Sequence, residues 1–314
     1  MEIVILDRDT LGSDADLQPL RQLGETVEYG STPVELVHER LVGADVAVVN
    51  KIRLNGSNLP GTGLQLICVA ATGYDNIDLE VCRTLGIALY NVPGYSTESV
   101  AQITAAMVLS LVNHLQEYRN YVHSGDYSRS GVANRVTPTY HELSSLTWGV
   151  VGGGGIGGRV AEIARSLGCR VLMHRRKPDD RFTQVDMDTL CRESDIVSLH
   201  VPLTPDTRGM LSRTRIATMK PGAIVVNVAR GAVADETALA DAVRSGQLGG
   251  LGIDVYATEP LTDDHPYQQI LDLPNVCLTP HMAWGALEAR NRCVAIMGDN
   301  IERFFCGSLR NRIV

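Results

Sequence analysis

The feature that most constrains this chain is a run of glycines, residues 152–158, in which only position 156 is not glycine. An apolar, β-rich segment at 148–151 precedes the run, and apolar residues at helical spacing follow it. A glycine turn between a strand and a helix lets a pyrophosphate approach the backbone and places helix N-terminal amides against the anion. The chain is therefore predicted to contain a doubly wound α/β domain with a dinucleotide site at this turn.

Two registers of the G-x-G-x-x-G pattern fit this run. One uses Gly152, Gly154 and Gly157, and the other is shifted by one residue. The first is preferred because its leading glycine directly follows the strand. A flexible glycine turn without a ligand is the alternative that the residues themselves leave open.

The next β-rich segment ends in the basic run Arg175, Arg176 and Lys177. A site for NAD usually has a carboxylate at this place for the ribose 2′-hydroxyl, whereas a guanidinium pairs with two oxygens of a 2′-phosphate. Two such bonds, at about 1.5–3 kcal/mol each, favour the phosphate by about a hundredfold or more. We predict that NADP(H) is preferred and that NAD(H) is the other usable coenzyme. The alternative is a solvated basic cluster, with Asp179 or Asp180 reaching back to the ribose.

Short β-rich segments alternate with helical ones before residue 95 and again after residue 147. Near-continuous apolar strands that alternate with helices are typical of parallel sheets covered on both faces. We predict an α/β protein with two doubly wound parallel-sheet domains, one flavodoxin-like and one of Rossmann type, and an interdomain cleft. A single long helix is expected at 96–122, an irregular arm at 125–139 and a last helix at 286–305. The expected strands are 3–6, 26–29, 45–49, 66–69 and 87–91, then 148–151, 170–173, 196–200, 223–228, 251–254 and 276–278.

Charge, cysteine content and hydropathy argue against several classes of protein. The 314 residues carry 28 Lys and Arg against 36 Asp and Glu, so the net charge of −8 opposes binding to nucleic acid. The seven cysteines include no C-x-x-C pair, which argues against a disulfide framework and a structural metal site. The N-terminus resembles a strand more than a signal peptide, and the apolar stretch 101–115 is too short and too polar to span a membrane. We expect a cytoplasmic, metal-free protein.

Three polar residues, Arg230, Glu259 and His281, follow predicted strands in the second half of the chain. Taken singly, each has an ordinary alternative: a surface ion pair, a loop carboxylate and a turn residue. Taken together they suit carbonyl reduction, because hydride delivery to a carbonyl makes an alkoxide that needs a proton and a cation. A carboxylate beside histidine favours the imidazolium that donates the proton, and an arginine binds both a carboxylate and a carbonyl oxygen.

With these residues in view, the chain resembles the D-isomer-specific 2-hydroxyacid dehydrogenases over essentially its full length. The stretches at 93–97 and 281–284 look most like the branch of glycerate dehydrogenases and hydroxypyruvate reductases. Ser145-Leu146 departs from the usual Gly-Lys of the family, and the basic run at Arg175 departs from its NAD-type pattern. The matching stretches are 70–78, 152–157, 200–204, 227–231 with Asp235 and Glu236, 254–260 and 279–281.

The resemblance implies a role for each catalytic residue. Arg230 would clamp the carbonyl and carboxylate of a 2-oxo acid, and His281 would protonate the carbonyl oxygen. Glu259 would hydrogen-bond His281 and keep it charged. The implied substrate-binding residues are Thr72 and Gly73 through their backbone amides, Arg230, His281 and, near the substrate mouth, Lys51. The implied cofactor-binding residues are Gly152, Gly154, Gly155, Ile156, Gly157, Arg175, Arg176, Pro202, Thr207, Val228, Ala229, Arg230, His281 and Asp254, the last on the nicotinamide carboxamide.

The resemblance also implies domains and an activity. A substrate domain would comprise 1–98 plus 287–314, and an NAD(P)-binding domain 99–286. The reaction would be NAD(P)H-dependent reduction of a small 2-oxo acid to the D-2-hydroxy acid in a homodimer. Hydroxypyruvate or glyoxylate is the expected substrate, because Trp284 beside the histidine would narrow the pocket. The alternatives are a dehydrogenase for a larger 2-oxo acid and a dinucleotide-sensing, corepressor-like binding protein without significant turnover.

Overall fold

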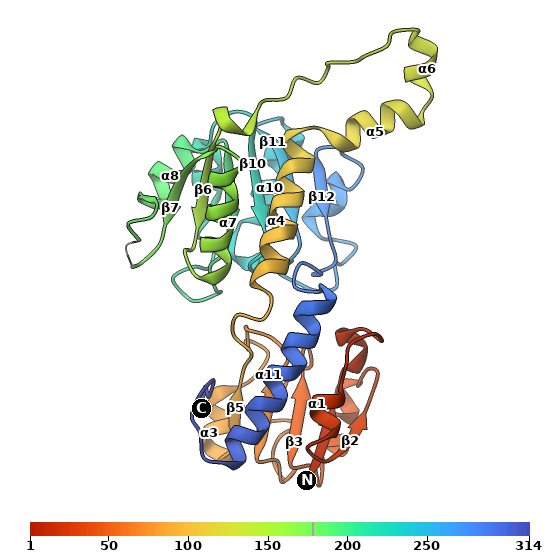
Figure 1. The fold of residues 1–314 in the computed structure, drawn as a ribbon, viewed down its shortest axis with the longest axis vertical. Helices are drawn as coiled ribbons and strands as arrows, with labels where there is room; N and C mark the ends of the chain where they lie inside the picture. Colours follow the sequence, from red (N-terminus) through yellow and green to blue (C-terminus); the bar gives the residue numbers. More distant parts are fainter. Residues whose placement is uncertain (178) are drawn as a thin grey trace. The chain divides into compact units, whose positions relative to one another are not determined.

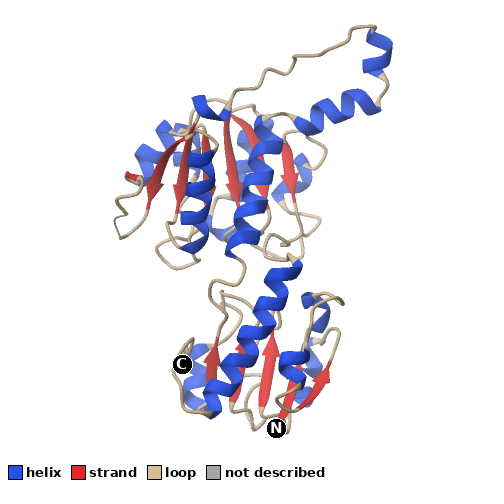
Figure 2. Ribbon diagram, in the orientation of Figure 1, coloured by secondary structure: helices blue, strands red, loops and turns tan. Residues whose placement is uncertain are grey.

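The computed structural model describes residues 1–177 and 179–314, which form two compact units. The first unit comprises Met1–Ser96 and Trp284–Val314, and the second comprises Thr97–Ala283. Each unit is a parallel β-sheet with helices on both faces (Figures 1 and 2). The prediction of two doubly wound α/β domains is therefore confirmed.

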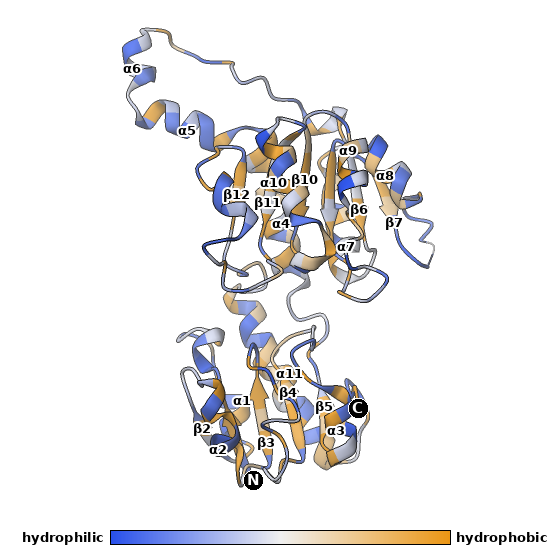
Figure 3. Ribbon diagram, turned by 180° about the vertical axis from the view of Figure 1, so that it is seen from behind, coloured by the Kyte–Doolittle hydropathy of each residue, from blue (hydrophilic) through white to orange (hydrophobic). Residues whose placement is uncertain are grey.

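The first unit is built on a five-stranded sheet in the order β2-β1-β3-β4-β5. Alternate residues of the buried strands belong to two apolar clusters, one under α11 and the other under α2 and α3. Figure 3 shows these strands as hydrophobic, as expected for a sheet covered on both faces. The elements are β1 (Glu2–Ile5), α1 (Gln18–Arg21), β2 (Glu25–Glu28), α2 (Val37–Leu41), β3 (Val46–Val49), β4 (Leu66–Val69), α3 (Leu79–Leu85), β5 (Ala88–Tyr90) and α11 (Leu287–Phe305), with 3-10 helices at Arg8–Leu11 and Val34–Leu36.

The second unit has a seven-stranded sheet in the order β12-β11-β10-β9-β6-β7-β8. After β8 the chain returns to place β9 beside β6, so the strand order reverses between these two strands. Ligands of open α/β sheets bind beyond the carboxyl ends of the strands at such a reversal. The strands are β6 (Thr147–Val151), β7 (Arg170–His174), β8 (Thr183–Gln184), β9 (Ile196–Leu199), β10 (Ala223–Asn227), β11 (Leu248–Ile253) and β12 (Val276–Leu278).

Helices cover this sheet because each presents an apolar face to it. On one face, α4 packs closely on β11, where Gly250 and Gly252 leave room for Leu111 and Met107. On the other face, α8, α9 and α10 contribute to one large apolar cluster with β9, β10 and β11. The helices are α4 (Thr97–Val112), α5 (Leu115–His123), α6 (Asp126–Ser130), α7 (Gly155–Ser166), α8 (Met187–Glu193), α9 (Arg213–Thr218) and α10 (Glu236–Arg244), with 3-10 helices at Leu143–Ser145, Gly231–Val233 and Pro266–Ile270.

Two local predictions were wrong, and one short strand was not predicted. The long helix expected at 96–122 is two helices, because the chain leaves α4 at Asn113 and His114 adopts a left-handed conformation with φ 51°. The arm expected to be irregular contains α6, which extends with α5 away from the sheet (Figure 1). The short strand β8 was not predicted, since two exposed residues carry no apolar pattern. None of the described helices is long and apolar enough to cross a membrane.

Candidate active site

Polar residues collect where β10, β11 and β12 end, because parallel strands bring their carboxyl ends to one edge of the sheet. Asn227 is the last residue of β10, while Asp254 and Thr279 directly follow β11 and β12. Asp254 is only 1% exposed. The three loops that carry Arg230, Glu259 and His281 start from these positions.

The Arg230 loop is held by the buried Asn227 side chain. Its amide group donates to the Arg230 carbonyl at 2.9 Å and accepts from the Ala229 amide at 3.0 Å. The next residue, Gly231, lies directly against the backbone of Tyr256 and Ala257, where a Cβ would collide. The absence of a side chain at Gly231 therefore lets the Arg230 loop pass close to the loop that leads to Glu259.

Glu259 and His281 form an ion pair. The His281 Nδ1 lies 2.7 Å and 2.9 Å from the two carboxylate oxygens of Glu259. A carboxylate only accepts hydrogen bonds, so Nδ1 carries the proton in this contact, and proton exchange with a substrate would use the other ring nitrogen, Nε2. The side chains are 20% and 30% exposed, so both are accessible and neither is buried as a core residue would be.

Asp254 fixes the backbone around His281. Its carboxylate accepts from the Thr279 hydroxyl at 2.6 Å and from the amides of Met282 and Ala283 at 2.8 Å and 3.0 Å. His281 itself has a left-handed backbone, with φ 52°, which the surrounding hydrogen bonds maintain. The contacts of Asp254 in the structure are thus with this loop, and its contact with a nicotinamide carboxamide stays a prediction.

A second carboxylate, Glu236 at the start of α10, holds the loop that carries Glu259. One oxygen accepts from the Ala257 amide at 2.9 Å, and the other lies 3.0 Å from Nε2 of His265. His265 is buried between the rings of Tyr256 and Tyr267. Burial raises the pKa of Tyr256 to about 12, so its hydroxyl stays protonated and donates to the Thr279 carbonyl. Sequence reasoning missed His265, because a lone histidine in a polar loop carries no periodic or motif signal.

The glycine turn has the geometry of a dinucleotide-binding turn. Gly152 ends the strand with φ 97°, Gly154 has open space where a Cβ would stand, and Gly157 lies against the Gly152 carbonyl too closely for any side chain. These are the three roles that the first register requires: a tight turn, a close approach for the pyrophosphate, and close packing of helix on strand. Gly155 begins α7, whose first amides have no partner within the helix and suit an anion.

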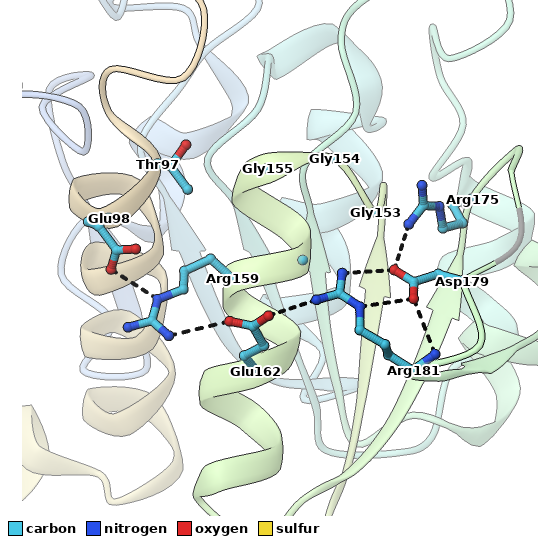
Figure 4. A pocket seen from close by; sticks show the side chains of 11 residues that line it. Thr97, Glu98, Gly153, Gly154, Gly155, Arg159, Glu162, Arg175, Asp179 and Arg181 are labelled. Carbon is cyan, nitrogen blue, oxygen red and sulfur yellow. Dashed lines mark hydrogen bonds and ion pairs between the residues drawn. The ribbon is translucent and has the colours of Figure 1, made fainter.

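A pocket of about 650 Å³ opens beside this turn. Figure 4 shows that three arginines and three carboxylates line it in alternation, from α4 across α7 to the segment after β7. Arg159 pairs with Glu98 at 2.9 Å, and Arg181 pairs with Glu162 at 2.8 Å. Together with the glycines, these residues fit a dinucleotide. The charged lining is Glu98, Arg159, Glu162, Arg175, Asp179 and Arg181.

The predicted basic residue Arg175 lies in this pocket, paired with Asp179. Its Nη1 donates to Asp179 Oδ2 at 2.8 Å, while Arg181 donates to both oxygens of the same carboxylate at 2.9–3.0 Å. These hydrogen bonds, above all those from Arg181, lower the pKa of Asp179 to about 2. Arg176 is exposed and does not line the pocket. The sequence had offered Asp179 only as an alternative partner for the ribose.

The remaining predicted coenzyme residues lie in loops after β9 and β10. The Thr207 hydroxyl donates to the Pro202 carbonyl at 2.6 Å and accepts from the Thr204 amide at 2.8 Å, so it closes this loop. Val228 and Ala229 directly follow β10. His200, which directly follows β9 and packs against the glycine turn, is half-buried, and desolvation of its ring lowers its pKa to about 3, so its imidazole is neutral. Among the described residues, no group of three or more His, Cys, Asp or Glu is arranged to hold a metal ion.

The predicted substrate-binding residues of the first unit follow β3 and β4. Thr72 donates to the Val92 carbonyl at 2.9 Å, which holds the loop that contains Gly73. Lys51 is exposed, and its amide donates to the buried carboxylate of Asp7 at 2.6 Å, as do the amides of Asn50 and Ile52. The roles of Thr72, Gly73 and Lys51 toward a substrate stay predictions.

A dinucleotide turn at a strand-order reversal, with a histidine–carboxylate pair and an arginine on neighbouring strand ends, is typical of nicotinamide-dependent dehydrogenases. Residues 105–283 match the model of the D-isomer specific 2-hydroxyacid dehydrogenase NAD-binding domain. The chain belongs to this family, and it is accordingly an oxidoreductase that uses a nicotinamide dinucleotide.

Individual relatives are similar over almost their whole length. The glycerate dehydrogenase of Methylorubrum extorquens is 36% identical over 99% of this chain and 98% of the relative. The hydroxypyruvate reductase of Blautia hydrogenotrophica is 33% identical over 98% of each chain. Among solved structures, the acyclic imino acid reductase Bsp5 in complex with NADPH and D-Arg superposes with a TM-score of 0.86 at 27% identity over 100% of both chains.

Proposed function

We propose that this protein reduces a small 2-oxo acid, hydroxypyruvate or glyoxylate, to the D-2-hydroxy acid with His281 as the proton donor. The hydrogen-bonded pair of His281 and Glu259 carries this proposal, because a carboxylate that accepts from Nδ1 orients the imidazole for proton transfer through its other nitrogen. The names of the relatives, a glycerate dehydrogenase and a hydroxypyruvate reductase, support the substrate class.

Each residue of the site has a distinct part in this reaction. The bound nicotinamide supplies the hydride. His281 donates a proton from Nε2 to the carbonyl oxygen, and Glu259 stabilises the imidazolium that precedes this step. Arg230 binds the carboxylate and the carbonyl oxygen of the 2-oxo acid, which places positive charge where the alkoxide develops. Asp254 and Glu236 act indirectly, by holding the loops of His281 and Glu259 through backbone amides.

For the coenzyme, we propose that NADP(H) is preferred and that Arg175 pairs with its 2′-phosphate. The position of Arg175 in the pocket beside the glycine turn supports this proposal. The NADPH in the related imino acid reductase shows that this fold accepts the phosphorylated coenzyme. The ion pair of Arg175 with Asp179 opposes the preference, because the guanidinium already has an anionic partner.

A substrate panel tests the proposed function. Hydroxypyruvate, glyoxylate, pyruvate and larger branched or aromatic 2-oxo acids are offered with NADPH and with NADH, and loss of reduced-nicotinamide absorbance is followed. The highest kcat/KM is expected for hydroxypyruvate or glyoxylate with NADPH. Highest activity with a larger acid would overturn the substrate, and no turnover with coenzyme still bound would favour a dinucleotide-sensing protein.

We further propose a homodimer and a cytoplasmic location. The segment from α5 through the arm exposes apolar side chains, including Leu115, Val122 and Val136, which a second copy would cover. Light scattering coupled to size-exclusion chromatography tests the dimer, and a monomeric mass would contradict it. All seven cysteines are free thiols, which is typical of a reducing compartment.

A further inference from the structure

The charged lining of the coenzyme pocket forms one continuous chain of ion pairs. The order is Glu98, Arg159, Glu162, Arg181, Asp179 and Arg175, and each neighbouring pair is in contact (Figure 4). Three guanidinium groups alternate with three carboxylates, so this lining has no net charge. Each guanidinium of this lining is already paired with a carboxylate, so a 2′-phosphate gains an unpaired guanidinium only when one of these pairs opens.

Asp179 holds its two arginine neighbours unequally. Arg181 donates through Nε to Oδ1 at 3.0 Å and through Nη2 to Oδ2 at 2.9 Å, and its backbone amide also donates to Oδ1. Arg175 makes a single bond, from Nη1 to Oδ2, and shares that oxygen with Arg181. A bidentate pair is the stronger arrangement. Arg175 is therefore the partner that Asp179 releases more readily.

Arg175 also lies where the proposed NADP(H) site would place the 2′-phosphate, in the pocket beside the glycine turn. It follows the last residue of β7, and its side chain lies over Gly153, close enough that a Cβ there would meet the Arg175 Cδ and Met173 Sδ. Its stem is packed against the glycine turn, and 23% of the side chain is exposed. Arg175 can therefore change partners by moving its guanidinium alone.

We propose that Asp179 sets the coenzyme preference of this chain by acting as an internal counter-ion that a 2′-phosphate must displace from Arg175. The inference rests on the proposed function of this pocket as the dinucleotide site. When NAD(H) binds, Arg175 and Asp179 stay paired. When NADP(H) binds, a phosphate of charge about −1.5 to −2 takes the Arg175 guanidinium, while Asp179 stays on Arg181. The preference for NADP(H) is thereby smaller than an unpaired arginine would give.

Equilibrium binding of NADP⁺ and NAD⁺ to the full-length protein, measured by calorimetry without a 2-oxo acid, tests this proposal. Asp179→Asn keeps the size of the side chain and removes its charge. The variant should bind NADP⁺ about tenfold more tightly, because Arg175 no longer gives up a counter-ion, while the Kd for NAD⁺ changes less than about twofold. Asp180→Asn, the same change at the exposed neighbour, is the matched control and should leave both constants within about twofold.

A double-mutant cycle assigns the effect to the Arg175–Asp179 pair. In an Arg175→Met background, Asp179→Asn should no longer strengthen binding of NADP⁺, because the arginine that it would release is gone. Equal gains in the two backgrounds would overturn the proposal and indicate a general charge effect. An unchanged ratio of the two constants in Asp179→Asn would also overturn it, and weaker binding of NAD⁺ would show that Asp179 binds the ribose.

The result of this binding test does not depend on whether the proposed enzymatic function is correct. Binding uses the coenzyme alone, so the shift in the ratio of Kd values can appear in a protein that reduces no 2-oxo acid. Conversely, a protein that passes the substrate panel can show no shift in Asp179→Asn. Thermal melts of each variant without coenzyme verify that the fold is intact, and Asp179→Ala repeats the measurement if the Asn variant does not fold.

Discussion

Two parts of the second unit hold their functional groups in opposite ways. One is the set of loops after β10, β11 and β12, here called the catalytic edge. The other is the glycine turn with the charged residues of its pocket, here called the coenzyme edge. At the catalytic edge, the loops after β11 and β12 donate their amides to two carboxylates, Asp254 and Glu236. At the coenzyme edge, the glycine turn is placed by backbone packed directly on backbone, as at Gly157 against Gly152. The charged side chains above it pair with one another.

The difference matches the two tasks. Proton transfer requires His281 and Glu259 at fixed positions, and hydrogen bonds that backbone amides donate to Asp254 and Glu236 fix them. Coenzyme binding requires room for a pyrophosphate and charges that can change partners. Glycines provide the room, and ion pairs that are partly open to solvent are weak enough to exchange. Changes at the first edge should therefore alter turnover, and changes at the second should alter binding or folding.

The largest expected effect is at the catalytic edge. His281→Ala should lower kcat by 10²–10⁴-fold, because it removes the general acid. The Kd for NADP⁺ should stay within about threefold, since the glycine turn lies elsewhere on the sheet. Steady-state kinetics measure kcat, and calorimetry measures the Kd for NADP⁺. A variant that keeps its turnover would remove His281 from the mechanism, and a large loss of coenzyme binding would contradict the separation of the two edges.

The next effect concerns folding at the coenzyme edge and its dependence on pH. The imidazole of His200 has a pKa of about 3 in the folded protein and about 6.5 in the unfolded chain. Below pH 6.5 the unfolded chain therefore takes up a proton that the folded chain does not. This uptake should lower the free energy of unfolding progressively, by about 3 kcal/mol at pH 4.

Replacing His200 tests that assignment. In His200→Leu, the slope of the unfolding free energy between pH 6.5 and 4, measured by urea titration, should fall by up to about 1.4 kcal/mol per pH unit. His123→Gln, at an exposed histidine, is the matched control and should keep the slope. An unchanged slope in the Leu variant would show that His200 is charged in the folded protein.

Two glycine substitutions test the separate roles of Gly157 and Gly154 in the turn. Gly157→Ala should cost about 1–3 kcal/mol of stability, because the new methyl group meets the Gly152 carbonyl. Gly154→Ala meets no atom within 4 Å and should melt like the native protein, yet bind coenzyme about tenfold more weakly. Thermal melts and calorimetry separate the two effects. Equal coenzyme affinity in Gly154→Ala would place the pyrophosphate elsewhere.

The smallest effect expected is at Glu259. Glu259→Gln should lower kcat by about tenfold, because the imidazole loses its charged hydrogen-bond partner. Steady-state kinetics measure the loss. An unchanged kcat would mean that the pair seen between Glu259 and His281 does not act in turnover.

Much of the architecture followed from local patterns. Short apolar runs predicted β4 and β12 to the residue, because apolar, β-branched or long aliphatic side chains in a parallel strand leave a strong compositional signal. The break between α4 and α5 was not predictable, since Asn113 and His114 are compatible with a helix and only their surroundings impose the left-handed turn. The pairing of Arg175 with Asp179 had been an open alternative, because spacing shows proximity but not which of several charges meet.

The sequence by itself determined which candidate functional residues follow which strands. These are the glycines directly after one strand, and an arginine, a glutamate and a histidine after later strands. Such positions can be predicted locally, because strand ends and turns depend on neighbouring residues. Which groups touch required the folded chain. Contacts such as Glu236 with His265, or Asp254 with the His281 loop, join residues 28 or 29 positions apart. Packing of the whole sheet places such pairs, and no short-range pattern encodes it.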